Sequence, residues 1–364
     1  MKHARLFNQY RYEMEKFPGD GFWPRDGNLG DPIQCLAVEN IYAKAGIKDL
    51  LLVNRDDLNT YDKEECSVVM QSWFGDYANL FPLPWSKKIN PVFIGFHLSK
   101  IGQTRQRFIT EKIAANMIPY QPIGCRDRNT RDFLLKQGVQ AYFSGCLTLT
   151  FDKRTVQPKN GKIFVVDLTA SARKILPKHI FETADFSITH FYYWNNYPLS
   201  YEGALEFENQ ARTILERYKN EAKLVITSKI HCAMPCIAMG IPVIFIHEDA
   251  KDCERFDVLQ GIIPMYRPQD AKYINWNPSP TNIDCLKKAI IKNTNDRIIG
   301  DSGLLAIDEL EKITNKLKPI DIKTEYIKYH SEYPAYFYHQ TMKLRMYILI
   351  KSKLKTIISF IRKK

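Results

Sequence analysis

The segment of residues 224–246 constrains the fold more than any other part of the chain. An apolar, β-branched run over 224–228 leads through Lys-Ile-His into small residues at helical spacing, and Gly240 precedes a second apolar run over 243–247. Two buried strands joined by a helix form a β-α-β unit, in which the strands are parallel. The segment therefore predicts an α/β protein.

The same alternation of β-branched runs and helical stretches extends over most of the chain. The spacing of apolar residues predicts further strands and helices on both sides of residues 152–161. The expected strands span residues 51–54, 67–71, 92–97, 139–143, 163–168 and 186–190, and the expected helices span residues 32–45, 129–137, 202–220, 231–239, 282–291 and 303–316.

Residues 152–161 are polar and contain Pro, Asn and Gly, a composition typical of a linker between domains. We expect an N-terminal Rossmann-like domain over residues 1–151, a C-terminal Rossmann-like domain over residues 162–316, and a C-terminal extension over residues 317–364. Ligands bind beyond the carboxyl ends of parallel strands. The two domains are therefore expected to face each other across a cleft that holds the functional site.

The net charge of +12 results from 52 Lys and Arg residues against 40 Asp and Glu residues. A basic chain is typical of proteins that bind nucleic acid, membranes or anionic substrates. Residues 341–364 hold eight of the basic residues and no acidic one, which leaves +4 for residues 1–340. Because most of the excess charge is confined to this tail, we expect no nucleic-acid interface on the folded body.

The tail of residues 341–364 also carries apolar residues near one face of a helix. A basic amphipathic helix suits an anionic membrane surface, whereas a final helix packed across both domains is the alternative. The chain begins without an apolar signal core, and no apolar run reaches the roughly 20 residues that span a bilayer. We expect a cytoplasmic protein that is peripheral at the inner face of the membrane through this tail.

The eight cysteines form no C-x-x-C pair, and several lie inside apolar runs. This pattern predicts reduced, buried thiols rather than a disulfide framework. His231, Cys232 and Cys236 match no common zinc spacing, and the chain has no D-x-D metal motif. We expect neither a metal site nor a bound cofactor.

Lys229 and His231 lie where the first strand of the β-α-β unit passes into its helix. A Lys at a helix N-terminus binds anions, and a His there can also move a proton near neutral pH. A histidine satisfied in the core is the alternative. Three further candidates are His97 and His190, each at the end of an expected strand, and Lys251, in a charged loop that could equally be only solvated.

Two other helix starts carry polar residues. Asn28 and Asp31 precede the first expected helix, where Asp31 is placed to cap it, and this loop could hold a hydroxylated or anionic ligand at the cleft. Arg126 follows the apolar Ile-Gly-Cys and stands near Arg128 and Arg131 at the next helix start. Guanidinium groups at a helix N-terminus form an anion site. Arg–Asp pairs on a solvated helix start explain Arg128 and Arg131 equally well.

Four segments in this order resemble the polysaccharide pyruvyl transferase family: residues 27–31, residues 125–138, residues 225–231 and residues 240–243. The resemblance spans roughly residues 22–260. It implies a fold similar to the two-domain glycosyltransferase-B architecture. It also implies transfer of a pyruvyl group from phosphoenolpyruvate, as co-substrate, onto two hydroxyls of a sugar, with release of phosphate and formation of a cyclic ketal.

The resemblance assigns roles to several of these residues. Arg126 corresponds to a family arginine that contacts phosphoenolpyruvate, and His231 to a family histidine with an acid/base or phosphate-stabilising role. Lys229 replaces a family arginine, which keeps the charge but loses the bidentate fork. Lys251 corresponds to a lysine found in some members. The expected phosphoenolpyruvate-binding residues are then Arg126 and, in the C-terminal domain, Lys229, His231 and Lys251. The expected acceptor-binding residues are Asn28, Asp31, His97 and His190.

The acceptor is left open between a lipid-linked oligosaccharide, a nucleotide sugar and a finished polymer. The alternative function is that of a glycosyltransferase of the same two-domain shape that uses a nucleotide sugar. That enzyme also needs cations for a diphosphate, so the basic residues alone do not separate the two functions.

Overall fold

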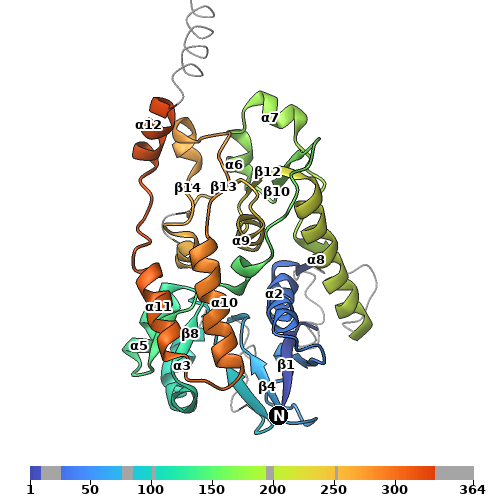
Figure 1. Cartoon of the computed structure of the whole chain (residues 1–364), viewed down its shortest axis with the longest axis vertical. Coiled ribbons are helices and arrows are strands. Elements are labelled where there is room, and N and C mark those ends of the chain that lie inside the picture. Colours follow the sequence, from blue (N-terminus) through green and yellow to red (C-terminus); the bar gives the residue numbers. More distant parts are fainter. Residues whose placement is uncertain (10–25, 76–84, 101–103, 194–200, 251–252, 333–364) are drawn as a thin grey trace, which may run out of the picture.

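The computed structural model describes residues 1–9, 26–75, 85–100, 104–193, 201–250 and 253–332. Two parallel four-stranded sheets with flanking helices form its framework, which confirms the α/β class (Figure 1). Lys251 and the expected basic helix over residues 341–364 lie outside the described residues. In the described ranges, no helix is both long and apolar enough to cross a membrane.

The first sheet has the strand order β3-β1-β4-β6, and all its pairings are parallel. Strand β1 lies inside this sheet, although the sequence pattern did not predict it. Its apolar residues Ala4, Leu6 and Phe7 are buried because neighbouring layers cover both faces of an interior parallel strand. The strands are β1 (Lys2–Phe7), β3 (Leu51–Asn54), β4 (Cys66–Val69) and β6 (Ile89–Val92).

The second sheet has the order β10-β12-β13-β14, again with parallel pairings. Helix α9 (Ile230–Ala238) joins β12 to β13, so the expected β-α-β unit is present. All nine residues of α9 are buried, which explains its small and apolar sequence. The strands are β10 (Lys162–Val166), β12 (Ala222–Thr227), β13 (Val243–Ile246) and β14 (Met265–Tyr266).

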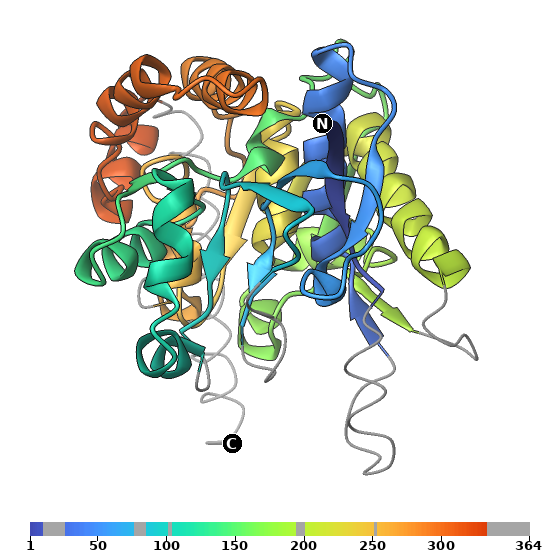
Figure 2. The same cartoon turned by 90° about the horizontal axis from the view of Figure 1, so that it is seen from below.

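Helices of the second half reach across to the first half (Figures 1 and 2). Helix α8 (Tyr201–Glu221) provides Glu208, whose two carboxylate oxygens accept hydrogen bonds of 2.7 and 2.8 Å from buried Arg5 of β1. Helix α10 (Asp284–Ile298) provides Asn293, whose side chain is hydrogen-bonded to the hydroxyl of Tyr142. The two halves are therefore held together by buried polar contacts as well as by a shared apolar core.

Two expected strands are wrong in detail. Residues 186–190 form no strand; β11 (Phe191–Tyr193) begins only after His190 and pairs antiparallel with β2 (Asp26–Asn28). The expected strand over 92–97 is split, so that His97 begins β7 (His97–Leu98) instead of ending a strand. A glycine at position 95 with a φ of +67° lies between the two pieces and turns the chain there.

The remaining elements complete the two halves. Cysteine pairing is absent as expected: all eight cysteines are free, and six are buried. The other helices and strands are α2 (Gly30–Lys44), β5 (Trp73–Phe74), α3 (Thr104–Thr110), α4 (Ala114–Met117), β8 (Ile123–Cys125), α5 (Arg128–Lys136), β9 (Ala141–Phe143), α6 (Ala170–Lys174), α7 (Lys178–Thr183), α11 (Leu304–Thr314) and α12 (Ile322–Glu332).

Candidate functional site

His231 lies in the first turn of α9, directly after the carboxyl end of β12, and its side chain is buried. The first turn of α2 packs against it so closely that a Cβ atom on Gly30 would lie 2.7 Å from His231 Nδ1. The same Cβ would lie 3.0 Å from Asn28 Oδ1, which accepts a hydrogen bond from the Gly30 N–H group. The structure thus brings Asn28 and His231, from opposite halves of the chain, to one place.

Arg126 follows strand β8 and is fully buried. Its Nη1 atom donates a hydrogen bond of 3.2 Å to Gln34 Oε1 on α2. Its Nε and Nη2 atoms have no hydrogen-bond partner among the residues that the structure describes. Burial lowers the pKa of Arg126, and Asp127 beside it opposes that effect. A buried guanidinium with unused donors is typical of a site that receives an anion.

His97 and Asp127 form a fully buried pair next to Arg126. His97 Nδ1 lies 2.5 Å from Asp127 Oδ2, and Asp127 Oδ1 accepts a 2.7 Å hydrogen bond from the Thr130 N–H group at the start of α5. Burial alone would raise the pKa of Asp127, but His97, Arg126 and Thr130 lower it to about 2. Burial and Arg126 lower the pKa of His97 to about 4, so its ring is neutral at pH 7.

His190 is a third buried histidine, besides His97 and His231, and precedes β11. Its Nε2 atom lies 2.9 Å from the hydroxyl of Tyr218 on α8, and the two rings stack with centroids 6.2 Å apart. Its backbone N–H group donates to Asp167 at the carboxyl end of β10, and its carbonyl accepts from Leu29. These contacts hold His190 between the two halves.

The charges of two arginines and two histidines act on His231. Burial, followed by Arg126, Arg255, His190 and His97, lowers the pKa of His231 well below its usual range. Each side chain keeps at least one buried nitrogen without a hydrogen-bond partner within the described parts of the chain. These atoms are Nε2 of His97, Nδ1 of His190, Nε2 of His231, Nε and Nη2 of Arg126, and Nε of Arg255.

Buried polar groups in folded proteins are nearly always paired, and these unpaired nitrogens belong to His231 and to four side chains whose charges act on it. We call these five residues the cleft cluster: His97, Arg126, His190, His231 and Arg255. A ligand with oxygen acceptors would satisfy the arginine N–H groups of the cluster.

Sequence analysis missed Arg255, because it lies in a charged segment that resembles a solvated loop. The structure places Arg255 in the 3-10 helix η4 (Glu254–Leu259), which packs against α5 and α9. Lys251, the residue expected from the same segment, lies outside the described residues. No local sequence signal distinguishes Arg255 from its charged neighbours.

The expected arrangement at two helix starts is corrected. Helix α2 begins at Gly30, so Asp31 lies in its first turn and does not cap it. Asp31 is nevertheless buried, and its charge acts on Arg126. At α5, the backbone N–H groups of Arg128 and Asn129 donate to Asp257 of η4, each at 3.1 Å. A carboxylate of the protein therefore occupies that helix N-terminus.

The remaining cations near the cleft have partners. The Lys229 ammonium lies 4.4 Å from the centroid of the Phe191 ring, on the strand that follows His190. Arg128 donates to the carbonyls of Asp257 and Thr314, and Arg131 pairs with Asp132. Arg131 thus forms the Arg–Asp pair of the alternative interpretation, whereas Arg128 is half-buried and is held by backbone carbonyls.

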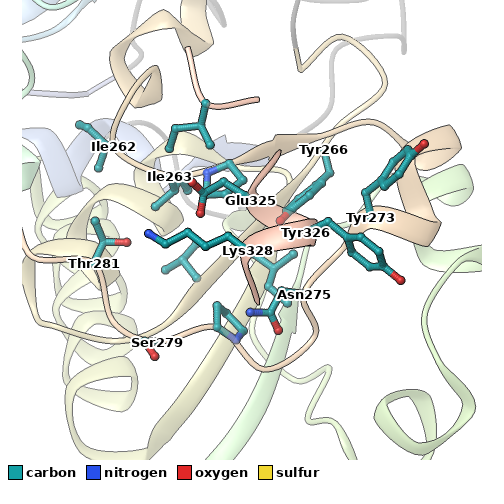
Figure 3. Close-up of a pocket in the computed structure, with 15 residues that line it drawn as sticks. Ile262, Ile263, Tyr266, Tyr273, Asn275, Ser279, Thr281, Glu325, Tyr326 and Lys328 are labelled. Carbon is teal, nitrogen blue, oxygen red and sulfur yellow. The ribbon is translucent and has the colours of Figure 1, made fainter. Parts of the chain in front are cut away.

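A separate cavity of about 310 Å³ lies between β13, β14 and α12 (Figure 3). Tyr266, Tyr273, Glu325, Tyr326 and Lys328 are among its lining residues. None of the cleft cluster lines it, and it contributes nothing to the arrangement around His231.

Comparison with known proteins identifies the family. The model of the polysaccharide pyruvyl transferase family matches residues 28–249. No curated protein sequence matches the chain. Among solved structures, an uncharacterized protein from Klebsiella pneumoniae is similar over 68% of this chain and 85% of its own, with 15% identity and a TM-score of 0.39. Because the family match covers more than half of the sequence, the chain belongs to the polysaccharide pyruvyl transferase family.

Proposed function

We propose that the protein transfers a pyruvyl group from phosphoenolpyruvate onto two hydroxyls of a sugar in a cell-surface polysaccharide or its precursor. The product is a cyclic ketal with a free carboxylate, and phosphate is released. The cleft cluster carries this proposal, because its unsatisfied nitrogens come from both halves of the chain and belong to His231 and to side chains whose charges act on it. The family supports the polysaccharide acceptor.

Phosphoenolpyruvate suits this site by its charge. Its phosphate and carboxylate groups offer several oxygen acceptors to the buried donors of Arg126 and Arg255. Lys229 stands at the start of α9, where the helix N-terminus adds a further positive field. We propose Arg126, Lys229, His231 and Lys251 as donor-binding residues, and add Arg255 to them.

The reaction requires proton transfers as well as anion binding. As one sugar hydroxyl attacks the substituted carbon, its proton is lost and the methylene carbon gains a proton. Phosphate then leaves, and the second hydroxyl closes the ring. We assign the acid or phosphate-stabilising role to His231, whose pKa rises when a trianion binds beside it. Asn28, Asp31, His97 and His190 are proposed to orient the acceptor.

One experiment separates this function from that of a nucleotide-sugar glycosyltransferase. Phosphoenolpyruvate and a series of nucleotide sugars are added to the protein in parallel thermal unfolding measurements. We expect phosphoenolpyruvate alone to raise the melting temperature. Incubation with phosphoenolpyruvate and lipid-linked glycans, followed by mass spectrometry, should then reveal the gain of one pyruvyl ketal. Stabilisation by a nucleotide sugar and not by phosphoenolpyruvate would contradict the proposal.

Residues 341–364 suggest where the reaction takes place. We propose that their eight basic residues and apolar face hold the protein at an anionic membrane surface on the cytoplasmic side, near a lipid-linked acceptor. Flotation with anionic vesicles tests this, comparing the full chain with a chain ending at Gln340. Equal flotation of both would reject the membrane role.

A further inference from the structure

The three buried histidines of the cleft cluster differ in the partner of the ring. His190 is bonded to a tyrosine hydroxyl, and His231 Nε2 has no partner among the described residues. Of the three, His97 alone has a carboxylate partner within the described residues: Asp127, at 2.5 Å. A carboxylate that holds one imidazole nitrogen fixes the tautomer of the ring and stabilises the imidazolium that forms when the other nitrogen takes a proton.

The geometry determines which nitrogen is available. Asp127 is ionised, so it can only accept hydrogen bonds, and His97 Nδ1 must carry the hydrogen between them. In the neutral ring, Nε2 then carries a lone pair. This Nε2 atom is buried and has no hydrogen-bond partner in the described part of the chain. A proton-accepting atom thus lies within the cluster.

Asp127 is itself held rigidly. Its Oδ1 atom caps α5 through the Thr130 N–H group at 2.7 Å, and its Oδ2 atom lies 3.9 Å from Arg126 Nε. The carboxylate is therefore fixed by a helix on one side and by a proposed donor-binding residue on the other. The orientation of the His97 ring follows from that of Asp127.

We propose that His97 is the general base that removes the proton from the attacking sugar hydroxyl, and that Asp127 is its positioning residue. This inference rests on the proposed pyruvyl transfer. It divides the proton transfers between two histidines, with His97 as base and His231 as acid. In the attack, the O–H bond breaks, its proton passes to His97 Nε2, and the oxygen bonds to the substituted carbon of phosphoenolpyruvate. The π bond of the C=C group breaks, and its electron pair takes a proton from His231, which is protonated while phosphoenolpyruvate is bound; the methylene carbon becomes a methyl group. One proton is thus lost to His97 and one is gained from His231.

The charges around His97 make its basicity depend on whether phosphoenolpyruvate is bound. Arg126 and Arg255 face it from the segment after β8 and from η4, His231 faces it from α9, and Asp127 opposes them. Without a donor, the two guanidinium groups and burial keep the ring neutral. A bound trianion offsets the guanidinium charges and raises the basicity of His97 only when the substrate is present.

The first arm of the test observes the tautomer and needs no activity. Long-range ¹H–¹⁵N NMR of histidine-labelled protein at pH 7 is compared between wild type, His97→Gln and Asp127→Asn. We expect one neutral ring with its hydrogen on Nδ1 and a strongly downfield proton, and both signals should vanish in His97→Gln. In Asp127→Asn the amide NH₂ group faces Nδ1, so the hydrogen should move to Nε2. A His97 ring that is protonated on Nε2 in the wild type would overturn the proposal.

The second arm measures the reaction with phosphoenolpyruvate and the lipid-linked glycan that accepts the ketal. His97→Ala should lower kcat by about 100- to 10,000-fold, the usual contribution of a general base, while the Kd of phosphoenolpyruvate changes little. Added imidazole should restore part of the rate, whereas it should not affect His179→Ala, a variant of an exposed histidine on α7. Asp127→Asn keeps an oxygen to cap α5 and should also lower kcat; Asp132→Asn on the same helix is its control.

The outcomes separate the two proposals. A wild type that transfers pyruvate and a His97→Ala variant that transfers it equally fast would overturn the role of His97 alone. Loss of activity without imidazole rescue, together with weaker phosphoenolpyruvate binding, would assign His97 to structure or donor binding instead. A wild type that does not turn over phosphoenolpyruvate would overturn both proposals.

Discussion

Gly30 lies against the imidazole of His231, with room for a hydrogen atom but not for a side chain. A Cβ at this position would come within 2.7 Å of Nδ1 and 3.2 Å of the His231 Cβ. The glycine is therefore required by a close approach between the first turns of α2 and α9. It lets the two halves of the chain meet at the residue on which the proposed chemistry depends.

Gly30→Ala should displace His231 without removing any functional group. We expect kcat/KM for pyruvyl transfer to fall by about 100-fold, the effect of a shift of roughly 1 Å in a reacting group. Gly138→Ala is a suitable control, because Gly138 has a φ of +77° at the end of α5 and no atom near its Cβ position. It should lower the stability by about 1 kcal/mol with kcat/KM retained. Equal kcat/KM values for Gly30→Ala and wild type would show that His231 does not need this position.

Arg126 should contribute to phosphoenolpyruvate binding through its charge and through the bidentate hydrogen bonds of its guanidinium group. Replacement by Met removes both and should weaken phosphoenolpyruvate binding by 100-fold or more, since a hydrogen bond to a charged group contributes about 1.5–3 kcal/mol. Arg126→Lys keeps the charge, and its Kd for phosphoenolpyruvate should lie between the values of Arg126→Met and the wild type. Calorimetric titration measures the Kd. Arg131→Met, on the exposed side of α5, should bind as the wild type does, and equal Kd values for both Met variants would remove Arg126 from the donor site.

Asp257 joins η4 to the start of α5, and its protonation should affect stability. Burial and the nearby Asp127 raise the pKa of Asp257 to about 7, above the 3.8 of an unperturbed aspartate. Between these two values the folded state binds more protons than the unfolded state, so this residue makes the protein less stable as the pH rises from about 4 to 7. Above pH 7 both states are ionised and the loss is complete.

Asp257→Asn removes this titration. The unfolding free energies of wild type and variant are measured by denaturant titration from pH 4.5 to 7.5. The value for the wild type minus the value for the variant should fall as the pH rises. Taking the difference cancels the opposite contribution of the neutral buried histidines, which are common to both proteins. Asp132→Asn, at an exposed position, should show a constant difference across the same range. A constant difference for Asp257→Asn would mean that Asp257 keeps an ordinary pKa.

The fold could be predicted from the sequence wherever buried residues form a continuous apolar run. The unit of β12, α9 and β13 is the clearest case, because every residue of the three elements except Lys223 is buried. Strand β1 could not be recognised, because it begins with Lys2 and His3 and because Arg5 interrupts its apolar residues. The charge of Arg5 is compensated by Glu208, which is 203 positions away, and nothing local in the sequence indicates that pair.

Some residues of the candidate site could be predicted from the sequence, and others could not. His231 follows a buried strand that the sequence predicts, and Arg126 stands out in the sequence because it follows the apolar Ile-Gly-Cys, which forms β8. Arg255 and Asp257 reach the site only because η4 docks against α5, a contact between distant segments that no spacing predicts. The roles of His97 and His190 depend on their partners, Asp127 and Tyr218, and not on strand ends.

Tyr218 should be a positioning residue for His190. Its hydroxyl lies 2.9 Å from His190 Nε2 and accepts a hydrogen bond of 3.1 Å from Cys232 Sγ. Tyr218→Phe preserves the stacked ring but leaves both partners unsatisfied in the core, which should lower the unfolding free energy by about 1 kcal/mol. Because His190 would lose the contact that orients its ring, KM for the acceptor should rise more than the Kd of phosphoenolpyruvate. Tyr42→Phe is the matched control: its buried hydroxyl has no hydrogen-bond partner among the described residues, and its removal should alter neither constant. Unchanged acceptor KM in Tyr218→Phe would separate His190 from acceptor binding and leave the Tyr218 hydroxyl a purely structural role.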